Sequence, residues 1–171
     1  MGMEYRVLVA DNMKGVEKGL SERLSPHYGF VQSRNTADAI KQMRNYDYHA
    51  LVTVQRNRFA PIKPLVFLEA MRGIRGNAIF EVSQLVGHFE DFQSYSDFYE
   101  THKDVPYISV FQSENPSLFS ECEDKKVIPL ELVARPNRPI GIEFMDALAS
   151  HLTSSVEERF GGKSLSIAGE R

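Results

Sequence analysis

Apolar and polar residues follow one another along this chain in short blocks, and the blocks predict strands and helices in turn. Residues 5–10 (YRVLVA) form a short aliphatic run that ends in Asp11-Asn12, which is typical of a buried parallel strand. In residues 13–24 the apolar or small side chains recur on one helical stripe, until Ser25-Pro26 stops the pattern. The chain therefore opens with a strand followed by a helix.

The same alternation continues in the following segments. Residues 30–33 predict a second strand, and residues 36–46 predict a second amphipathic helix. Residues 50–54 (ALVTV) are apolar at nearly every position, as expected of a strand whose sheet is covered by helices on both faces. A polar loop follows, and residues 65–71 predict a third helix.

The last part of the chain supplies two more strands and a long helix. We predict strands at residues 107–111 and 127–134, and an amphipathic helix at residues 142–160 that ends at Gly161-Gly162. Five short strands that alternate with helices predict an α/β fold with a doubly wound, five-stranded parallel sheet. In such a sheet, functional groups collect beyond the carboxyl ends of the strands.

The segment at residues 73–103 is longer than a simple connection between a helix and a strand. Aromatic residues recur in it every three or four positions, which predicts an inserted helical segment before the fourth strand. These residues, which suit either core packing or a binding stripe, are Phe89, Phe92, Tyr95, Phe98 and Tyr99. We expect one domain at residues 1–160, including this insertion, and a flexible tail at residues 161–171.

Composition and charge exclude several classes of protein. The chain has 171 residues, of which 42% are hydrophobic, so it can bury the core of one domain. Its formal net charge of −3 gives no general attraction to nucleic acid or anionic lipid. No apolar stretch is long enough for a signal peptide or a membrane span, and the single Cys122 excludes an internal disulfide. We therefore expect a cytoplasmic protein without nucleic-acid binding or membrane insertion.

No group of residues in the sequence forms a catalytic or metal-binding motif. The five histidines lack the spacing of metal ligands, and no Ser-His-Asp or Cys-His arrangement can be read from the chain. We expect no enzymatic activity and no cofactor. Arg56, Arg58 and Lys63 follow the central predicted strand, where they suit either an anion-binding patch or an ordinary solvated loop.

Several of these segments together resemble the receiver domain of bacterial response regulators, the superfamily that includes the chemotaxis regulators. The segments are RVLVADN, FVQSRNTADAIKQM, YHALVTV, VPYISVFQ and LVARPN, and the resemblance covers residues 4–72 and 104–160. It implies a flavodoxin-like sheet with strand order 2-1-3-4-5 and a role in two-component signal transduction.

The resemblance also implies which residues occupy the family's phosphorylation site. In receiver domains two acids after the first strand hold Mg²⁺, and an aspartate that ends the third strand accepts the phosphoryl group. A Ser or Thr ends the fourth strand, and a Lys-Pro follows the fifth. The corresponding positions in this chain are Asp11, Asn12, Val54, Phe111, Arg135 and Pro136. A register that differs by one residue would place the acceptor position at Thr53 or Gln55, and neither of these is a carboxylate.

This correspondence implies a degenerate site, because the nucleophile, the second acid and the hydroxyl are replaced. Asp11 keeps one carboxylate, which suits a weak cation site with Asn12, a helix cap, or an ion pair with Arg135. The resemblance thus implies a pseudo-receiver that signals without phosphorylation, by binding protein partners. A homodimer is one assembly that the resemblance allows.

Two further functions remain open at the level of sequence. One is a flavodoxin-like domain that binds a small molecule or nucleotide in the vacated pocket, and the other is an unconventional enzyme on the same scaffold. For the protein-binding function, the residues expected at the interface are Phe89, Phe92, Tyr95, Phe98, Tyr99, Leu132, Ile142 and Met145.

Overall fold

The computed structural model describes residues 4–11, 15–55, 89–111, 128–131 and 141–161. Within these ranges strands and helices alternate as the sequence predicts. The elements are β1 (Tyr5–Ala10), α1 (Gly15–Leu24), β2 (Tyr28–Ser33), α2 (Thr36–Asn45), β3 (Ala50–Gln55), α5 (Phe92–His102), β4 (Tyr107–Phe111), β5 (Ile128–Glu131), α7 (Ile142–Val156) and a π-helical turn at Glu157–Gly161.

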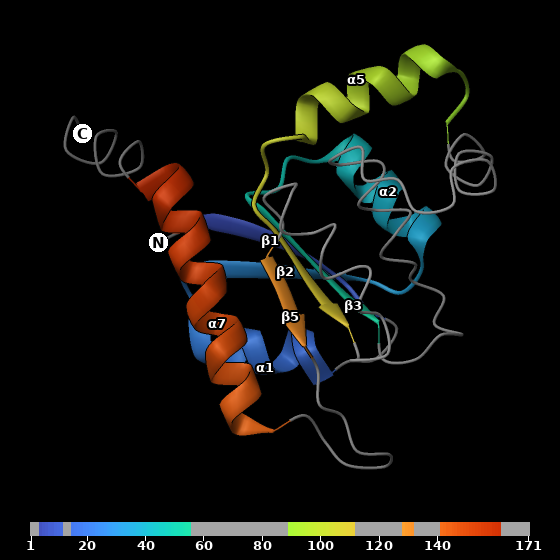
Figure 1. The fold of residues 1–171 in the computed structure, drawn as a ribbon. Coiled ribbons are helices and arrows are strands. Elements are labelled where there is room, and N and C mark those ends of the chain that lie inside the picture. Colours follow the sequence, from blue (N-terminus) through green and yellow to red (C-terminus); the bar gives the residue numbers. More distant parts are fainter. Residues whose placement is uncertain (1–3, 12–14, 56–88, 112–127, 132–140, 162–171) are drawn as a thin grey trace.

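The five strands form one parallel sheet (Figure 1). Their order is β2-β1-β3-β4-β5, so β1, β3 and β4 lie inside the sheet and β2 and β5 lie at its edges. This confirms the predicted fold class and strand order. All five strands end at the same edge of the sheet, which brings residues that are distant in sequence to one rim.

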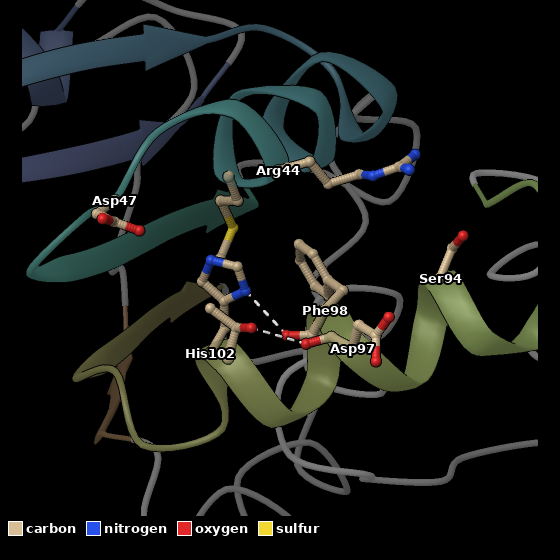
Figure 2. Close-up of a pocket in the computed structure, with 8 residues that line it drawn as sticks. Arg44, Asp47, Ser94, Asp97, Phe98 and His102 are labelled. Carbon is tan, nitrogen blue, oxygen red and sulfur yellow. Dashed lines mark hydrogen bonds between the residues drawn. The ribbon is translucent and has the colours of Figure 1, made fainter.

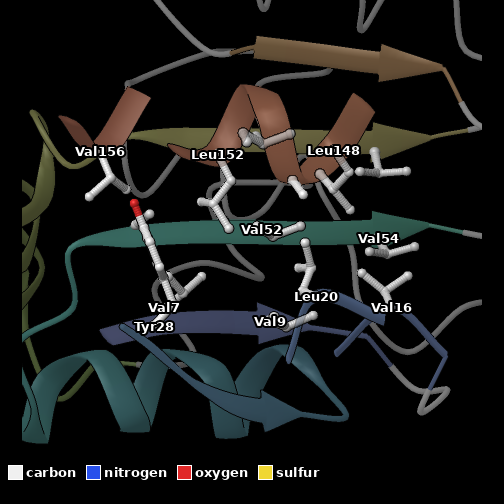
Figure 3. Close-up of a cluster of buried hydrophobic side chains, with 14 of the residues drawn as sticks. Val7, Val9, Val16, Leu20, Tyr28, Val52, Val54, Leu148, Leu152 and Val156 are labelled. Atoms are coloured by element: carbon white, nitrogen blue, oxygen red, sulfur yellow. The ribbon is translucent and has the colours of Figure 1, made fainter. Parts of the chain in front are cut away.

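The two faces of the sheet are covered by different helices. Val9, Val52 and Val54 face α1 and α7 and form an aliphatic cluster with them (Figure 3). Successive side chains of a strand point to opposite faces, so Leu8 and Leu51 point to the other face, where α2 lies (Figure 1). Burial of each aliphatic side chain of this size contributes about 1.5–3 kcal/mol.

Polar caps determine where two of the helices begin. The Asn35 side chain accepts a hydrogen bond from the backbone N–H of Asp38, and α2 begins at the next residue after Asn35. The Asp91 carboxylate accepts in the same way from the N–H of Ser94, at 2.7 Å, at the start of α5. Each cap satisfies a backbone donor that the first helical turn leaves without an intrahelical partner.

Most predicted segments are confirmed, with differences at their ends. The helix expected at residues 142–160 is an α-helix only to Val156 and then widens into the π-helical turn. The predicted third helix at residues 65–71 lies outside the described residues. The aromatic helix predicted within the insertion is present as α5, which leads directly into β4 and lies beside the carboxyl end of α2 (Figure 1).

Candidate functional site

The carboxyl edge of the sheet carries buried polar side chains. Asp11, directly after β1, has no solvent-exposed surface, and neither do Ser33, Thr53 and Ser109 near the ends of β2, β3 and β4. The backbone also joins neighbouring strands here, because the N–H of Asp11 donates to the Ser33 carbonyl at 2.9 Å. A polar rim at this edge agrees with the general location of sites in doubly wound sheets.

The hydroxyl groups of this edge lie in one row across the sheet. Strand pairing aligns Ser33 with Ala10, Ala10 with Thr53, and Thr53 with Ser109, so their side chains point to the α2 face. Thr53 Oγ1 lies 3.0 Å from the hydroxyl oxygen of Tyr107 and 3.5 Å from Ser109 Oγ. Part of the hydrogen-bonding capacity of these hydroxyl groups is therefore satisfied within the sheet itself.

Val54 is the residue that the sequence resemblance aligns with the phospho-acceptor aspartate of receiver domains. Because Ala10 pairs with Thr53, Asp11 and Val54 are the next residues along their neighbouring strands. The Val54 side chain is fully buried in the aliphatic cluster between the sheet and helices α1 and α7 (Figure 3). A valine in these surroundings has neither a nucleophilic atom nor access to a phosphodonor.

The other predicted members of the degenerate site are only partly described. Phe111 ends β4, where its backbone pairs with Gln55 and Glu131. Asn12, Arg135 and Pro136 lie outside the described residues, as do the candidate anion-patch residues Arg56, Arg58 and Lys63. The predicted ion pair between Asp11 and Arg135 therefore stays a prediction.

A second candidate site is a groove between α2 and α5 (Figure 2). It has a volume of about 270 Å³. Both helices end close to the starts of the strands that follow them, so the groove lies near the amino edge of the sheet, away from Asp11 and Val54. Its lining comes from Met43, Arg44 and Asp47 on one side and from Ser94, Asp97, Phe98, Thr101 and His102 on the other.

Aromatic contacts hold α5 in place beside this groove. The Phe98 ring lies 5.2 Å from the Phe89 ring and 4.5 Å from the His102 ring. His102 Nδ1 is 2.9 Å from the Phe98 carbonyl oxygen, which fixes the orientation of the imidazole (Figure 2). The Arg44 guanidinium lies over the Phe89 ring, 5.4 Å from its centroid, and so links α2 to the start of α5.

The charged residues exposed on α5 are acidic, namely Asp97 and Glu100. Hydrogen bonds from Ser94 to the Asp91 carboxylate lower the pKa of that group, so it is ionised at neutral pH. Lys103 donates to Glu100 at 2.8 Å, and this bond raises the pKa of the lysine. The Asp97 carboxylate accepts only from the neutral amide of Gln93, at 2.8 Å, among the residues described. Within the described part of the chain, Asp97 therefore has no cationic partner at the groove.

The residues predicted for a protein interface separate into core and surface. Phe89 and Phe98 are buried, at 7% and 4% exposure, whereas Tyr95 and Tyr99 are half-buried. Ile142 is 73% exposed at the start of α7. Leu132 lies outside the described residues, and of Phe92 only the helical backbone is described.

Met145 differs from the expectation for an interface residue. Its side chain is 4% exposed because it packs against α1, where a Cβ on Gly19 would lie 2.6 Å from Met145 Cε. The missing side chain at Gly19 lets the two helices approach closely. Met145 therefore belongs to the core and cannot contribute to a surface contact.

Sequence reasoning did not identify most of the groove. The pattern predicted the aromatic residues of α5, but Arg44, Asp47, Ser94, Thr101 and His102 carry no motif and come together only when α2 and α5 lie side by side. Within the described ranges there is no metal-ligand cluster of three or more His, Cys, Asp or Glu side chains. No helix among these residues is long and apolar enough to cross a membrane.

Comparisons with known proteins identify the fold. No protein-family model and no curated protein matches the sequence. Solved structures do match over nearly the whole chain. The receiver domain of the Francisella response regulator 1452 is 11% identical with a TM-score of 0.54, and the match covers 91% of this chain and 98% of that one.

Two other structures match to a similar extent. A signal receiver domain of a two-component histidine kinase from Clostridium thermocellum is 13% identical, with a TM-score of 0.54 and coverage of 91% of this chain and 99% of that one. An adenylate cyclase structure from Rhodopirellula baltica is 9% identical, with a TM-score of 0.53 and coverage of 95% and 97%. Similarity at such low identity establishes the fold alone. The chain has the fold of response-regulator receiver domains.

Proposed function

We propose that this chain is a pseudo-receiver: a signalling module of the two-component type that works without phosphorylation, by binding protein partners. The observation that carries the proposal is the burial within the aliphatic core of Val54, the residue that the resemblance aligns with the acceptor position. In this proposal the domain is not an enzyme, takes no cofactor and acts in the cytoplasm without binding nucleic acid.

The neighbouring positions on β3 do not offer a substitute nucleophile. Thr53 is fully buried and points to the opposite face of the sheet, where it interacts with Tyr107 and Ser109. Asp11 keeps a carboxylate at the edge, but that residue also has no exposed surface. The arrangement supports a fold that is retained for binding after loss of the phosphorylation chemistry.

The alternative function, small-molecule binding in the vacated pocket, has less support. It needs an open polar cavity at the carboxyl edge, where, among the residues described, Val54 packs into the core. The groove described above lies near the other edge. The acidic and aromatic surface of α5, at that other edge, is better suited to a protein partner.

The test is to incubate the chain with acetyl phosphate, or with beryllofluoride, in the presence of Mg²⁺. We expect no mass increase by intact-protein mass spectrometry and no change in the amide NMR spectrum, because no accessible carboxylate stands at the acceptor position. A conventional receiver domain treated in parallel is the positive control. A stoichiometric, hydroxylamine-sensitive phosphoryl adduct on this chain would refute the proposal.

A further inference from the structure

We infer that the groove between α2 and α5 binds a lysine or arginine side chain of a protein partner, with an apolar residue of the same partner segment beside it. This inference rests on the proposed protein-binding function and specifies its partner. It follows from three features of the groove: its floor, its charges and its size.

The floor of the groove combines apolar and polar side chains that are packed closely. Met43 is 2% exposed, and Phe98 and His102 are each 4% exposed, so they present packed surface rather than mobile side chains. The methylene stem of a lysine or arginine can cover the apolar part of this floor, formed by Met43 and Phe98, while its charged end remains near water. An apolar neighbour on the partner would extend the contact along the half-buried Tyr95 and Tyr99.

The rim of the groove attracts positive charge. Asp47 of the α2 side and Asp97 of α5 are both exposed, and neither has a cationic partner among the residues described. Among the described residues of the lining, Arg44 is the one arginine or lysine, and its charge already interacts with the Phe89 ring and with the nearby Asp91. An incoming ammonium or guanidinium group can therefore pair with Asp47 or Asp97 without displacing an internal partner.

The charges around the groove also favour a basic partner over an acidic one. Glu90, Asp91, Glu100 and Asp104 are exposed on or beside α5. Of the described cations near them, Lys103 is bonded to Glu100 and Arg44 lies over the Phe89 ring. An acidic peptide or a nucleic acid would be repelled by this surface. A volume of about 270 Å³ lies below the usual range for small-molecule sites and suits a single side chain from a larger partner.

The experiment uses the full chain and a short, acetylated and amidated peptide of alternating arginine and leucine, labelled for fluorescence anisotropy. The matching glutamate and leucine peptide is the charge control. We expect the basic peptide to bind and to shift the backbone amide signals of α5 and of the carboxyl end of α2. The acidic peptide should produce neither effect.

Two substitutions test the groove itself. Asp97→Asn removes a charge of the groove and should weaken binding of the basic peptide roughly three- to fivefold. Ser94→Trp fills the space of the groove and should weaken binding roughly tenfold or more. The matched controls are Glu90→Gln, which removes an acid outside the groove, and Ser154→Trp, which adds the same bulk on exposed α7. Both controls should change the affinity less than about twofold.

The result is decisive in either direction. Equal losses for Asp97→Asn and Glu90→Gln, or amide shifts centred away from α2 and α5, would show only general attraction to acidic surface and would overturn the inference. Because Asp97 is exposed, its variant should fold even if Ser94→Trp does not. Phosphorylation of the chain would refute the proposed function while leaving groove binding measurable, so the two failures are distinguishable.

Discussion

Single side chains in the core show how burial decides the chemistry of this protein. Val54 packs among aliphatic residues that include Val16 and Leu20 of α1 (Figure 3). An ionised carboxylate at this position would lose several kcal/mol through desolvation unless the surroundings rearranged. The aliphatic environment therefore suits the valine that is present, and it makes a simple reversion to aspartate unfavourable.

Tyr28 is a residue whose polar group lacks a partner among the residues described. Its hydroxyl is buried without a hydrogen bond and points toward Val156 (Figure 3). Burial, reinforced by Glu157, raises the pKa of Tyr28 to about 12. The neutral form is thus favoured in the folded state, and a polar atom is desolvated there without compensation.

We predict that Tyr28→Phe increases the free energy of unfolding by about 1 kcal/mol, because it removes a buried, unsatisfied hydroxyl and keeps the ring. The contribution of Tyr28 ionisation to stability is complete below pH 10, the unfolded-state value, and is lost as the pH rises toward 12. Urea unfolding at pH 7 and pH 11 measures both effects. Tyr46→Phe, at a 53% exposed position, is the matched control, and equal behaviour of the two variants would contradict the prediction.

At the scale of whole elements, α1 and α7 form the layer that covers the Val54 face. They are joined by close packing at Gly19 and Met145 and by an ion pair in which Arg23 Nε lies 2.8 Å from the Asp146 carboxylate. Arg23 also donates to the Gly19 carbonyl, so its side chain is bonded both to α1, at Gly19, and to α7, at Asp146. The Asp146 side of this ion pair is exposed to solvent, which weakens the pair, and the packing contact is the stronger determinant of the helix separation.

We predict that Gly19→Leu lowers the free energy of unfolding by about 1–2 kcal/mol, because overpacking costs about 1–3 kcal/mol and better helix propensity offsets up to about 1 kcal/mol. Gly19→Ala should cost less, since the clash falls on the flexible end of Met145. Urea denaturation measures both variants. The double variant Gly19→Leu with Met145→Ala should recover stability relative to Gly19→Leu, and failure to do so would argue against this contact as the cause.

At the scale of the whole molecule, His49 connects the beginning of the sheet to the end of α7. Its Nδ1 accepts a hydrogen bond from the Arg6 backbone N–H at 3.0 Å. Its ring makes edge contacts with Tyr5, at 5.4 Å, and with Phe160 of the π-helical turn, at 5.0 Å. Burial, followed by the charge of Arg6, lowers the pKa of His49, so the neutral imidazole is the form that fits this junction.

We predict that the protein loses stability as the pH falls below 6.5, the unfolded-state pKa of a histidine. A folded-state pKa below that value means that the unfolded chain binds the proton more readily. The stabilising contribution is therefore complete above pH 6.5 and disappears as the pH falls through the folded-state value. His49→Asn, which keeps an acceptor for Arg6 but does not titrate, should reduce this dependence in unfolding experiments between pH 5 and pH 8.

The control for this prediction is His151→Asn, which replaces an exposed histidine on α7 and should leave the pH dependence unchanged. Equal pH dependence in wild type and His49→Asn would show that other groups are responsible. Loss of the Phe160 contact in the His49 variant is a separate effect, and it would lower stability at every pH.

Local pattern was sufficient to predict the sheet. The aliphatic runs of β1 and β3, and the helical stripes of α1, α2 and α7, identify each element because backbone periodicity limits which side chains can be buried. The helix α5 was predicted from its aromatic spacing for the same reason. Helix and strand ends were less accurate, since capping and the π-helical turn depend on contacts beyond the local pattern.

The sequence by itself determined the parallel α/β architecture and the absence of a carboxylate at Val54, because both depend on residue type and order along the chain. Only the tertiary structure decided that Val54 is enclosed by α1 and α7 and that Met145 is buried against Gly19. It alone brought Asp47 and Asp97 to one groove. Those outcomes depend on how helices pack across the sheet, and helix packing is set by side-chain shape at contacts between residues that are far apart in the sequence.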